Sequence, residues 1–253
     1  MKSILKYIFL AGIRDRLYIG LFFTLVASFS FSLFLGSTSL VENQQTAAVY
    51  IAGSSRAILA IGMILFVCLN VNRAFENKEV EFIISKSISR EQFILGYLFG
   101  FFIAASLIII PLILAIYLVT DADKFGILLW SISLVLELMI LISFSLLSSL
   151  ILKNSFSAIL ISFGFYIISR LMGVFVLAIK IPDSITQAKN QFLEVGLKFL
   201  SAVFPRLDLF GQSDWLIYGL TSFGNFKIIL FQSLIYIPLL IFMSFHDFKK
   251  KQF

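Results

Sequence analysis

Three ionisable side chains lie inside apolar stretches that are long enough to cross a membrane: Arg56, Glu137 and Arg170. An ionised group at membrane depth is costly, and it normally faces other protein or a water-filled cavity. Counted from the outer ends of their expected helices, Glu137 and Arg170 both lie about ten residues deep, or roughly 15 Å at the helical rise per residue. Arg56 lies about eight residues deep, and we expect its long side chain to extend toward the outer headgroups.

Glu137 and Arg170 belong to neighbouring helices, because only a short turn around Lys153 and Asn154 separates the two apolar stretches. Equal depth, antiparallel neighbours and opposite charge predict an ion pair between them. Two interpretations of this pair stay open. The pair either fixes two helices together or lines a polar path through the membrane.

The residues needed for several common kinds of catalysis are missing from the sequence. There is no G-x-x-x-x-G-K-[ST] loop to cradle nucleotide phosphates. A single histidine, His246, and a single cysteine, Cys68, cannot form a zinc site, a bis-histidine haem site or an intrachain disulfide. We therefore expect a protein without catalytic residues, metal or cofactor.

The composition excludes an ordinary soluble domain. Of 253 residues, 60% are hydrophobic and 13% are charged, with a mean hydropathy of +1.01. The net charge of +6 falls mostly in short loops beside apolar stretches, so it indicates membrane orientation and not nucleic-acid binding. We expect one all-α polytopic membrane domain over residues 1–253, with six transmembrane helices in contact with the lipid bilayer.

The expected helices are placed by runs of about 20 apolar residues. Residues 1–16 have the pattern of an amphipathic helix at the interface, with a cleaved signal peptide as the competing interpretation. Residues 181–225 do not span; we expect short outer interfacial helices there, with Trp215 and Tyr218 at headgroup level. The six expected spans are 17–36, 48–72, 93–119, 127–152, 156–180 and 226–245.

The distribution of basic residues favours both termini in the cytoplasm. With that orientation, twelve Lys and Arg residues lie in inner segments and six lie in outer segments. This asymmetry is the usual sign of the cytoplasmic side. The charged loop of residues 73–92 is then cytoplasmic too.

We expect a short amphipathic helix in this loop. Asn77 can accept hydrogen bonds from the first turn, and Val80, Ile83 and Ile84 fall on one stripe. Ser89 with Gln92 forms a capping box that starts the next span. The loop is either a solvated connector or a docking element whose apolar stripe needs a partner. Its excess of glutamate favours a protein over anionic lipid.

The loop sequence E-N-K-E-V-E-F-I-I-S-K-S-I-S-R resembles the cytoplasmic loop of permease subunits of ABC-2 type transporters, although Ser87 stands where a proline is common. The segment F-P-R-L-D-L-F at 204–210 and the ending F-H-D-F-K at 245–249 are similar to the branch linked to multicopper-enzyme maturation. With the six expected spans, the resemblance covers nearly the whole chain.

The resemblance implies the function. In that family the loop is a coupling helix that docks on a separate ATPase subunit, and two permeases, identical or not, form one translocation unit. This chain would then be the membrane permease of an ATP-binding-cassette exporter in a bacterial inner membrane. The alternatives are an ATPase-independent scaffold or assembly factor for a metalloenzyme and, less favoured, a membrane-embedded enzyme. The implied ATPase-docking residues are Glu76, Glu79, Val80, Glu81, Ile83, Ile84, Lys86 and Arg90.

Overall fold

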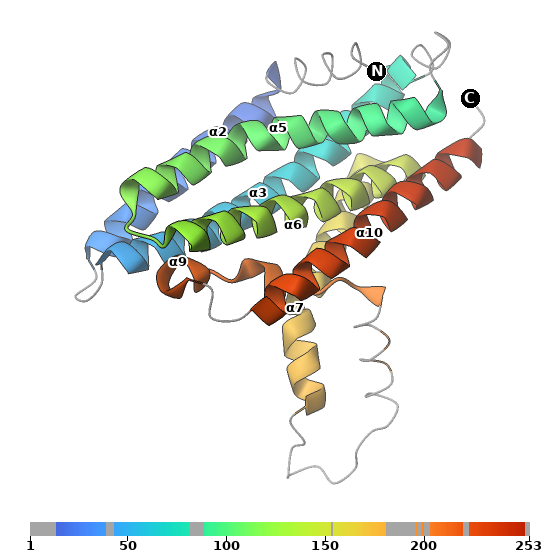
Figure 1. Cartoon of the computed structure of the whole chain (residues 1–253). Coiled ribbons are helices and arrows are strands. Elements are labelled where there is room, and N and C mark those ends of the chain that lie inside the picture. The colour runs from blue at the N-terminus through green and yellow to red at the C-terminus, as the bar shows by residue number, and fades with distance from the viewer. Residues whose placement is uncertain are drawn as a thin grey trace.

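The fold is a bundle of long helices. The computed structural model describes residues 14–38, 43–80, 89–152, 154–180, 196, 199, 203–219 and 223–250 (Figure 1). The described ranges hold helices and no strand, which confirms the all-α expectation. Six of the helices are long and apolar enough to cross a membrane. They are α2 (Arg16–Ser37), α3 (Asn43–Glu76), α5 (Arg90–Val119), α6 (Lys124–Ile151), α7 (Ser155–Lys180) and α10 (Phe223–Lys250).

Five of the six long helices include their whole expected apolar span, α6 ends one residue before its span does, and most extend a turn further at one or both ends. The extra turns are polar, so a hydropathy window does not include them. Side chains satisfy the first backbone N–H groups there: Asp15 accepts from the N–H of Leu17 at 3.0 Å, and Asp123 accepts from that of Gly126 at 2.7 Å. Ser89 and Gln92 form the expected capping box at the start of α5.

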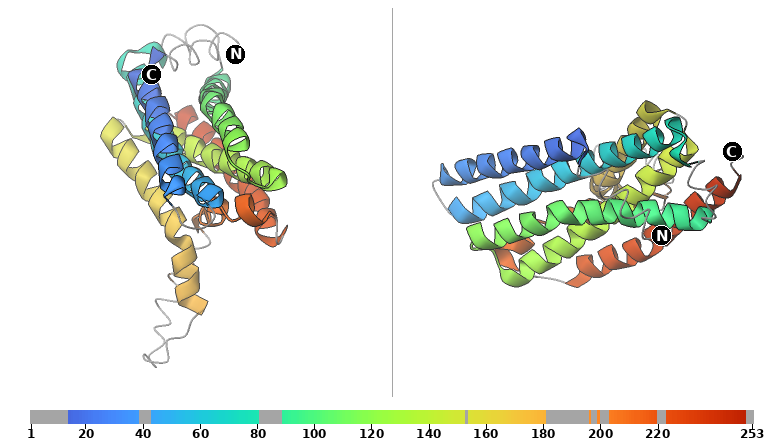
Figure 2. Two further views of the ribbon diagram at one scale, coloured as in Figure 1. Left: turned by 90° about the vertical axis from the view of Figure 1, so that its left-hand side faces the viewer. Right: turned by 90° about the horizontal axis from the view of Figure 1, so that it is seen from above.

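Helix α6 is the centre of the bundle and packs against α3, α5, α7 and α10. Its buried side chains include Trp130, Leu134 and Leu138, which recur every four residues and are at most 1% exposed. Helices α2 and α3 lie side by side as an antiparallel pair (Figure 2). Helix α7 crosses the others at a wide angle, and its carboxyl-terminal half stands away from the bundle (Figures 1 and 2).

One end of the bundle collects the starts of α2 and α5 and the ends of α3 and α10 (Figure 1). Asp15 pairs with Arg73 at 2.9 Å. Arg90 donates to the backbone carbonyls of Phe248 and Lys249 at 3.1 and 2.7 Å, at the end of α10. We call this the inner end, because it carries the segments expected in the cytoplasm.

The opposite end, called here the outer end, is closed by residues 203–219, which include a 3-10 turn η1 (Leu209–Gly211) and the single-turn helix α9 (Trp215–Tyr218). Trp215 is only 3% exposed, and its ring lies 6.0 Å from that of Phe226. The expectation that Trp215 reaches the headgroups is therefore wrong. Gly126 explains the burial, since a Cβ atom there would overlap the carbonyl of Trp215. Tyr218 is 72% exposed.

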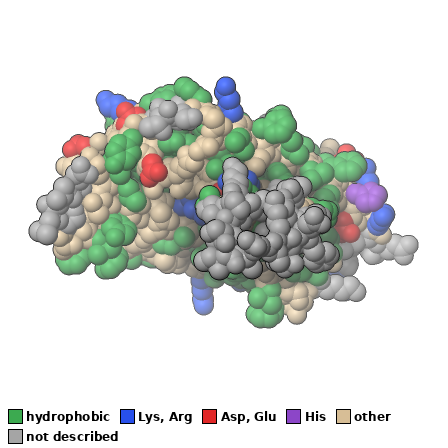
Figure 3. Space-filling model, turned by 90° about the horizontal axis from the view of Figure 1, so that it is seen from below, with side chains coloured by type: hydrophobic (Ala, Val, Ile, Leu, Met, Phe, Trp, Pro, Cys, Tyr) green, Lys and Arg blue, Asp and Glu red, His purple; other side chains and the backbone are tan. Residues whose placement is uncertain are grey.

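The long helices are largely apolar on the surface that faces away from the centre of the bundle. Exposed side chains include Phe23 on α2, Leu160 on α7 and Leu234 on α10. Figure 3 shows hydrophobic side chains across the face seen from below and the histidine at one end. Such a surface suits lipid contact, as expected of a multi-pass membrane protein. The expected interfacial helix of residues 1–16, apart from its last three residues, and most of residues 181–202 lie outside the described residues.

Candidate functional site

The three intramembrane charges meet where α3, α6 and α7 pack together. One carboxylate oxygen of Glu137 on α6 forms an ion pair with Arg56 of α3, with Nη1 to Oε2 at 2.5 Å. Its other oxygen faces Arg170 of α7, with Nη1 to Oε1 at 3.5 Å. The sequence indicated a contact between Glu137 and Arg170. The structure adds Arg56 as the closer partner.

Arg56 is 1% exposed, so the expectation that it extends to the outer headgroups is wrong. Its Nη2 atom donates to the Ser133 hydroxyl at 3.0 Å and to the Trp130 carbonyl at 3.3 Å. The guanidinium carbon also lies 5.2 Å from the Trp130 ring centre, within the range of a cation–π interaction. These contacts satisfy a cation that has no access to water.

The depth of Arg56 was underestimated because α3 begins at Asn43, before the apolar run does. Arg56 follows Asn43 by thirteen residues, and Glu137 follows Lys124, the first residue of α6, by thirteen as well. Both helices start at the outer end, so the two charges lie at one level, roughly 20 Å along their helices.

The segment of residues 204–211, which ends in the 3-10 turn η1, covers the third side of this cluster. Two of its backbone carbonyls accept hydrogen bonds. The Leu207 carbonyl accepts one from Arg170 Nη1 at 2.8 Å, and the Phe210 carbonyl accepts one from the Ser133 hydroxyl at 3.1 Å. The backbone N–H of Leu207 donates a hydrogen bond to the Ser169 carbonyl of α7 at 3.1 Å. The segment F-P-R-L-D-L-F at 204–210 is thus part of the packed interior, and hydropathy alone gave no sign of that contact.

Two glycines allow the segment to approach α7. A Cβ atom on Gly211 would occupy the place of the Arg170 guanidinium, and one on Gly173 would come within 2.7 Å of the Asp208 carboxylate. Asp208 is itself paired with Arg206 at 2.8 Å. The segment therefore brings a second ion pair to the same face of α7, one turn from Arg170.

The arrangement makes the cluster a strong packing constraint. Removing one partner of a buried ion pair leaves an unpaired buried charge and typically costs about 3–5 kcal/mol. The Glu137 carboxylate holds three helices together at once, since its two oxygens face α3 and α7. Ser133 and Trp130, which complete the site, are ordinary helix residues in the sequence and carried no signal of this role.

The expected ATPase-docking residues divide into three groups. Glu76 is exposed at the end of α3, and Glu79 is partly buried. Val80 is 1% exposed and packs into the core, so the expectation that it presents an apolar surface to a partner is wrong. Lys78 has a φ of 57°, a left-handed conformation that turns the chain sharply at this point. Residues Glu81, Ile83, Ile84 and Lys86 lie outside the described residues.

Arg90, also assigned to docking, is bonded to the end of α10 as described above, and Glu91 beside it pairs with Lys249 at 2.6 Å. The Phe93 and Phe248 rings stack at 5.3 Å, which adds apolar contact to the same joint. Arg90 therefore connects the loop to α10. Its guanidinium donates to the carbonyls of Phe248 and Lys249, so these N–H groups are not available for docking.

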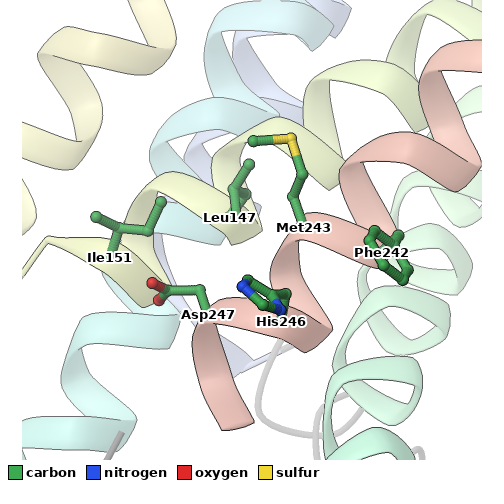
Figure 4. A pocket seen from close by; sticks show the side chains of 6 residues that line it. All are labelled: Leu147, Ile151, Phe242, Met243, His246 and Asp247. Carbon is green, nitrogen blue, oxygen red and sulfur yellow. The ribbon is translucent and has the colours of Figure 1, made fainter. Parts of the chain in front are cut away.

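A pocket of about 310 Å³ opens between the inner ends of α6 and α10 (Figure 4). Asp247 has one buried carboxylate oxygen, Oδ2, without a hydrogen-bond partner among the described residues. The described ranges contain no group of three or more His, Cys, Asp or Glu residues that could hold a metal. The pocket is lined by Leu147, Ile151, Phe242, Met243, His246 and Asp247.

Comparison with known proteins adds no relative: no family model and no curated protein matches the chain.

Proposed function

We propose that this chain is the transmembrane permease subunit of an ATP-binding-cassette transporter of the ABC-2 type, most simply an exporter. The observation that carries the proposal is the loop between α3 and α5, whose ends are bonded to other helices. Arg73 before the loop pairs with Asp15 of the α2 N-cap, and Arg90 after it binds the end of α10. Force applied to such a loop acts on four helices and not on one.

The loop sequence supplies the second support, through its resemblance to the coupling helix of this family. The proposal keeps Glu76 and Glu79 as polar contacts and Ile83 and Ile84 as the apolar contacts of a separate ATPase subunit. Val80 is left out because it is buried. The chain itself would not hydrolyse ATP, since it lacks a phosphate-binding loop. A second permease subunit completes the transporter in this family.

The test is recovery of the ATPase. Apolar contacts at the centre of an interface commonly contribute most of the affinity, so Ile83→Asp should reduce recovery of an ABC ATPase from native membranes by at least about tenfold. Ile83→Leu is the matched control and should recover it normally. Both variants should insert and elute as the unmodified chain does. Normal recovery with Ile83→Asp would reject the docking assignment, and a stable permease that never recovers an ATPase would favour the scaffold alternative.

The proposal also requires the loop to face the cytoplasm. Lys78 and Gln44 are both exposed, at opposite ends of the bundle, and the native Cys68 is fully buried. A cysteine at position 44 should react with an impermeant thiol reagent in intact cells, whereas one at position 78 should react only after the membrane is opened. Labelling of both positions from the same side would contradict the orientation.

A further inference from the structure

The formal charges of the buried cluster and of the adjoining segment 204–211 do not balance. The cluster contains Arg56, Arg170 and Arg206 and two carboxylates, Glu137 and Asp208. Three cations against two anions leave one net positive charge. Since Glu137 lies closest to Arg56 and Asp208 pairs with Arg206, the under-compensated cation is Arg170.

Arg170 also has unused hydrogen-bond donors. A guanidinium carries five N–H donors, and the hydrogen bonds of Arg170 to described residues all come from Nη1, to Glu137 and to the Leu207 carbonyl. Its Nε and Nη2 atoms donate to no described residue. The side chain is 33% exposed, whereas those of Arg56 and Glu137 are 2% and 0% exposed. Of the two arginines that face Glu137, Arg170 is therefore the one that a ligand can reach.

We propose that Arg170 binds an anionic oxygen group, a carboxylate or a phosphate, in the outer half of the bundle. The N–H groups of Nε and Nη2, which donate to no described residue, lie on one planar fork that matches two oxygens of such a group. Asp208 pairs with Arg206 on the adjoining segment, and Arg56 is the closer partner of Glu137, so both carboxylates near Arg170 have another cation at shorter distance. Gly211 leaves the space in which the fork lies.

The ligand is either a free anion or the head of an anionic amphiphile. That such a ligand is the transported cargo rests on the proposed function, whereas the binding itself does not. The binding test therefore uses the permease alone, in nanodiscs of phosphatidylcholine without any ATPase.

Trp130 provides the signal, because its ring lies 5.2 Å from Arg56 beside the cluster and the chain has only one other tryptophan. In a Trp215→Phe background, we expect saturable change of Trp130 fluorescence with decyl phosphate and none with decyltrimethylammonium of the same chain length. An inorganic phosphate titration then separates the two sources: a response to it at similar concentration identifies a free anion, and a response to decyl phosphate alone identifies an amphiphile head.

Arg170→Gln should weaken the binding at least tenfold, and Lys124→Gln, which removes a cation at the outer end but outside the cluster, should leave it unchanged. If Arg170→Gln does not accumulate, Arg170→Lys keeps the charge but loses the fork, and it should weaken binding at least threefold. No saturable signal with either phosphate, an equal response to the ammonium amphiphile, or affinity unaffected by both Arg170 variants would overturn the proposal. Anion binding without ATPase recovery would reject the transport function and keep the site.

Discussion

The inner end and the outer half of the bundle both contain ion pairs, but their surroundings differ. At the inner end, Lys249 and Glu91 are 59% and 53% exposed, and Arg73 is 52% exposed beside Asp15. In the outer half, Arg56 and Glu137 are 2% and 0% exposed. Exposed pairs contribute about 0–1 kcal/mol, whereas breaking a buried pair costs several times more. The inner pairs therefore connect helix ends that can separate, and the buried cluster fixes a core.

The largest expected effect is that of Glu137→Gln. The change leaves the buried Arg56 and the partly exposed Arg170 without their shared carboxylate, and we expect a loss of stability of about 3–5 kcal/mol and poor accumulation in the membrane. Thermal unfolding in detergent, monitored by size-exclusion chromatography, measures the loss of stability. Glu91→Gln at the inner end is the matched control and should change stability by at most about 1 kcal/mol. Equal losses in the two variants would remove the distinction between the two regions.

Within the outer cluster, the two arginines should differ. Arg56→Met should cost about 3–5 kcal/mol because it strips Glu137 of its closest partner. Arg170→Met should cost roughly 1–3 kcal/mol, since Arg170 is partly exposed and makes the longer contact. In double-mutant cycles with Glu137→Leu, the coupling energy should be larger for Arg56 than for Arg170. The opposite order would mean that the α6–α7 contact dominates, as the sequence alone indicated.

A smaller effect is expected where the outer end closes. Gly126→Ala places a methyl group against the backbone carbonyl of Trp215, which cannot move as a flexible side chain can, and should cost about 1–3 kcal/mol. Gly164→Ala, also within a long helix, meets no atom within 4 Å and should be neutral or slightly stabilising. Unfolding temperatures of the two variants measure the difference. Equal temperatures would show that residues 214–219 are not fixed against α6.

The sequence predicts the membrane helices well because burial in lipid imposes long apolar runs on each of them. The expected spans lie within the observed helices or differ from them by a residue at one end, as with 127–152 and α6. The ends are harder to place: Asn43 begins α3 in a polar turn, outside any hydropathy window.

The site was predicted less completely. Glu137 and Arg170 could be related because a short turn makes their helices neighbours. Arg56 belongs to a helix whose contact with α6 no local pattern specifies, and its partners include backbone carbonyls, which every residue has. Val80 shows the converse error, since an apolar stripe predicts burial but does not tell what covers it.

Helix α3 is unbroken from Asn43 to Glu76, so Arg56 lies twenty residues, or roughly 30 Å, from the last residue of the helix. A tilt of about 5° over that length displaces Arg56 by roughly 2–3 Å. Hydrogen bonds weaken steeply beyond about 3.5 Å, the distance at which Glu137 already holds Arg170. A tilt of this size would lengthen the contact between Arg56 and Glu137 and leave more of the carboxylate to Arg170. The tilt of α3 at the inner end would thereby alter the electrostatic potential around Arg170.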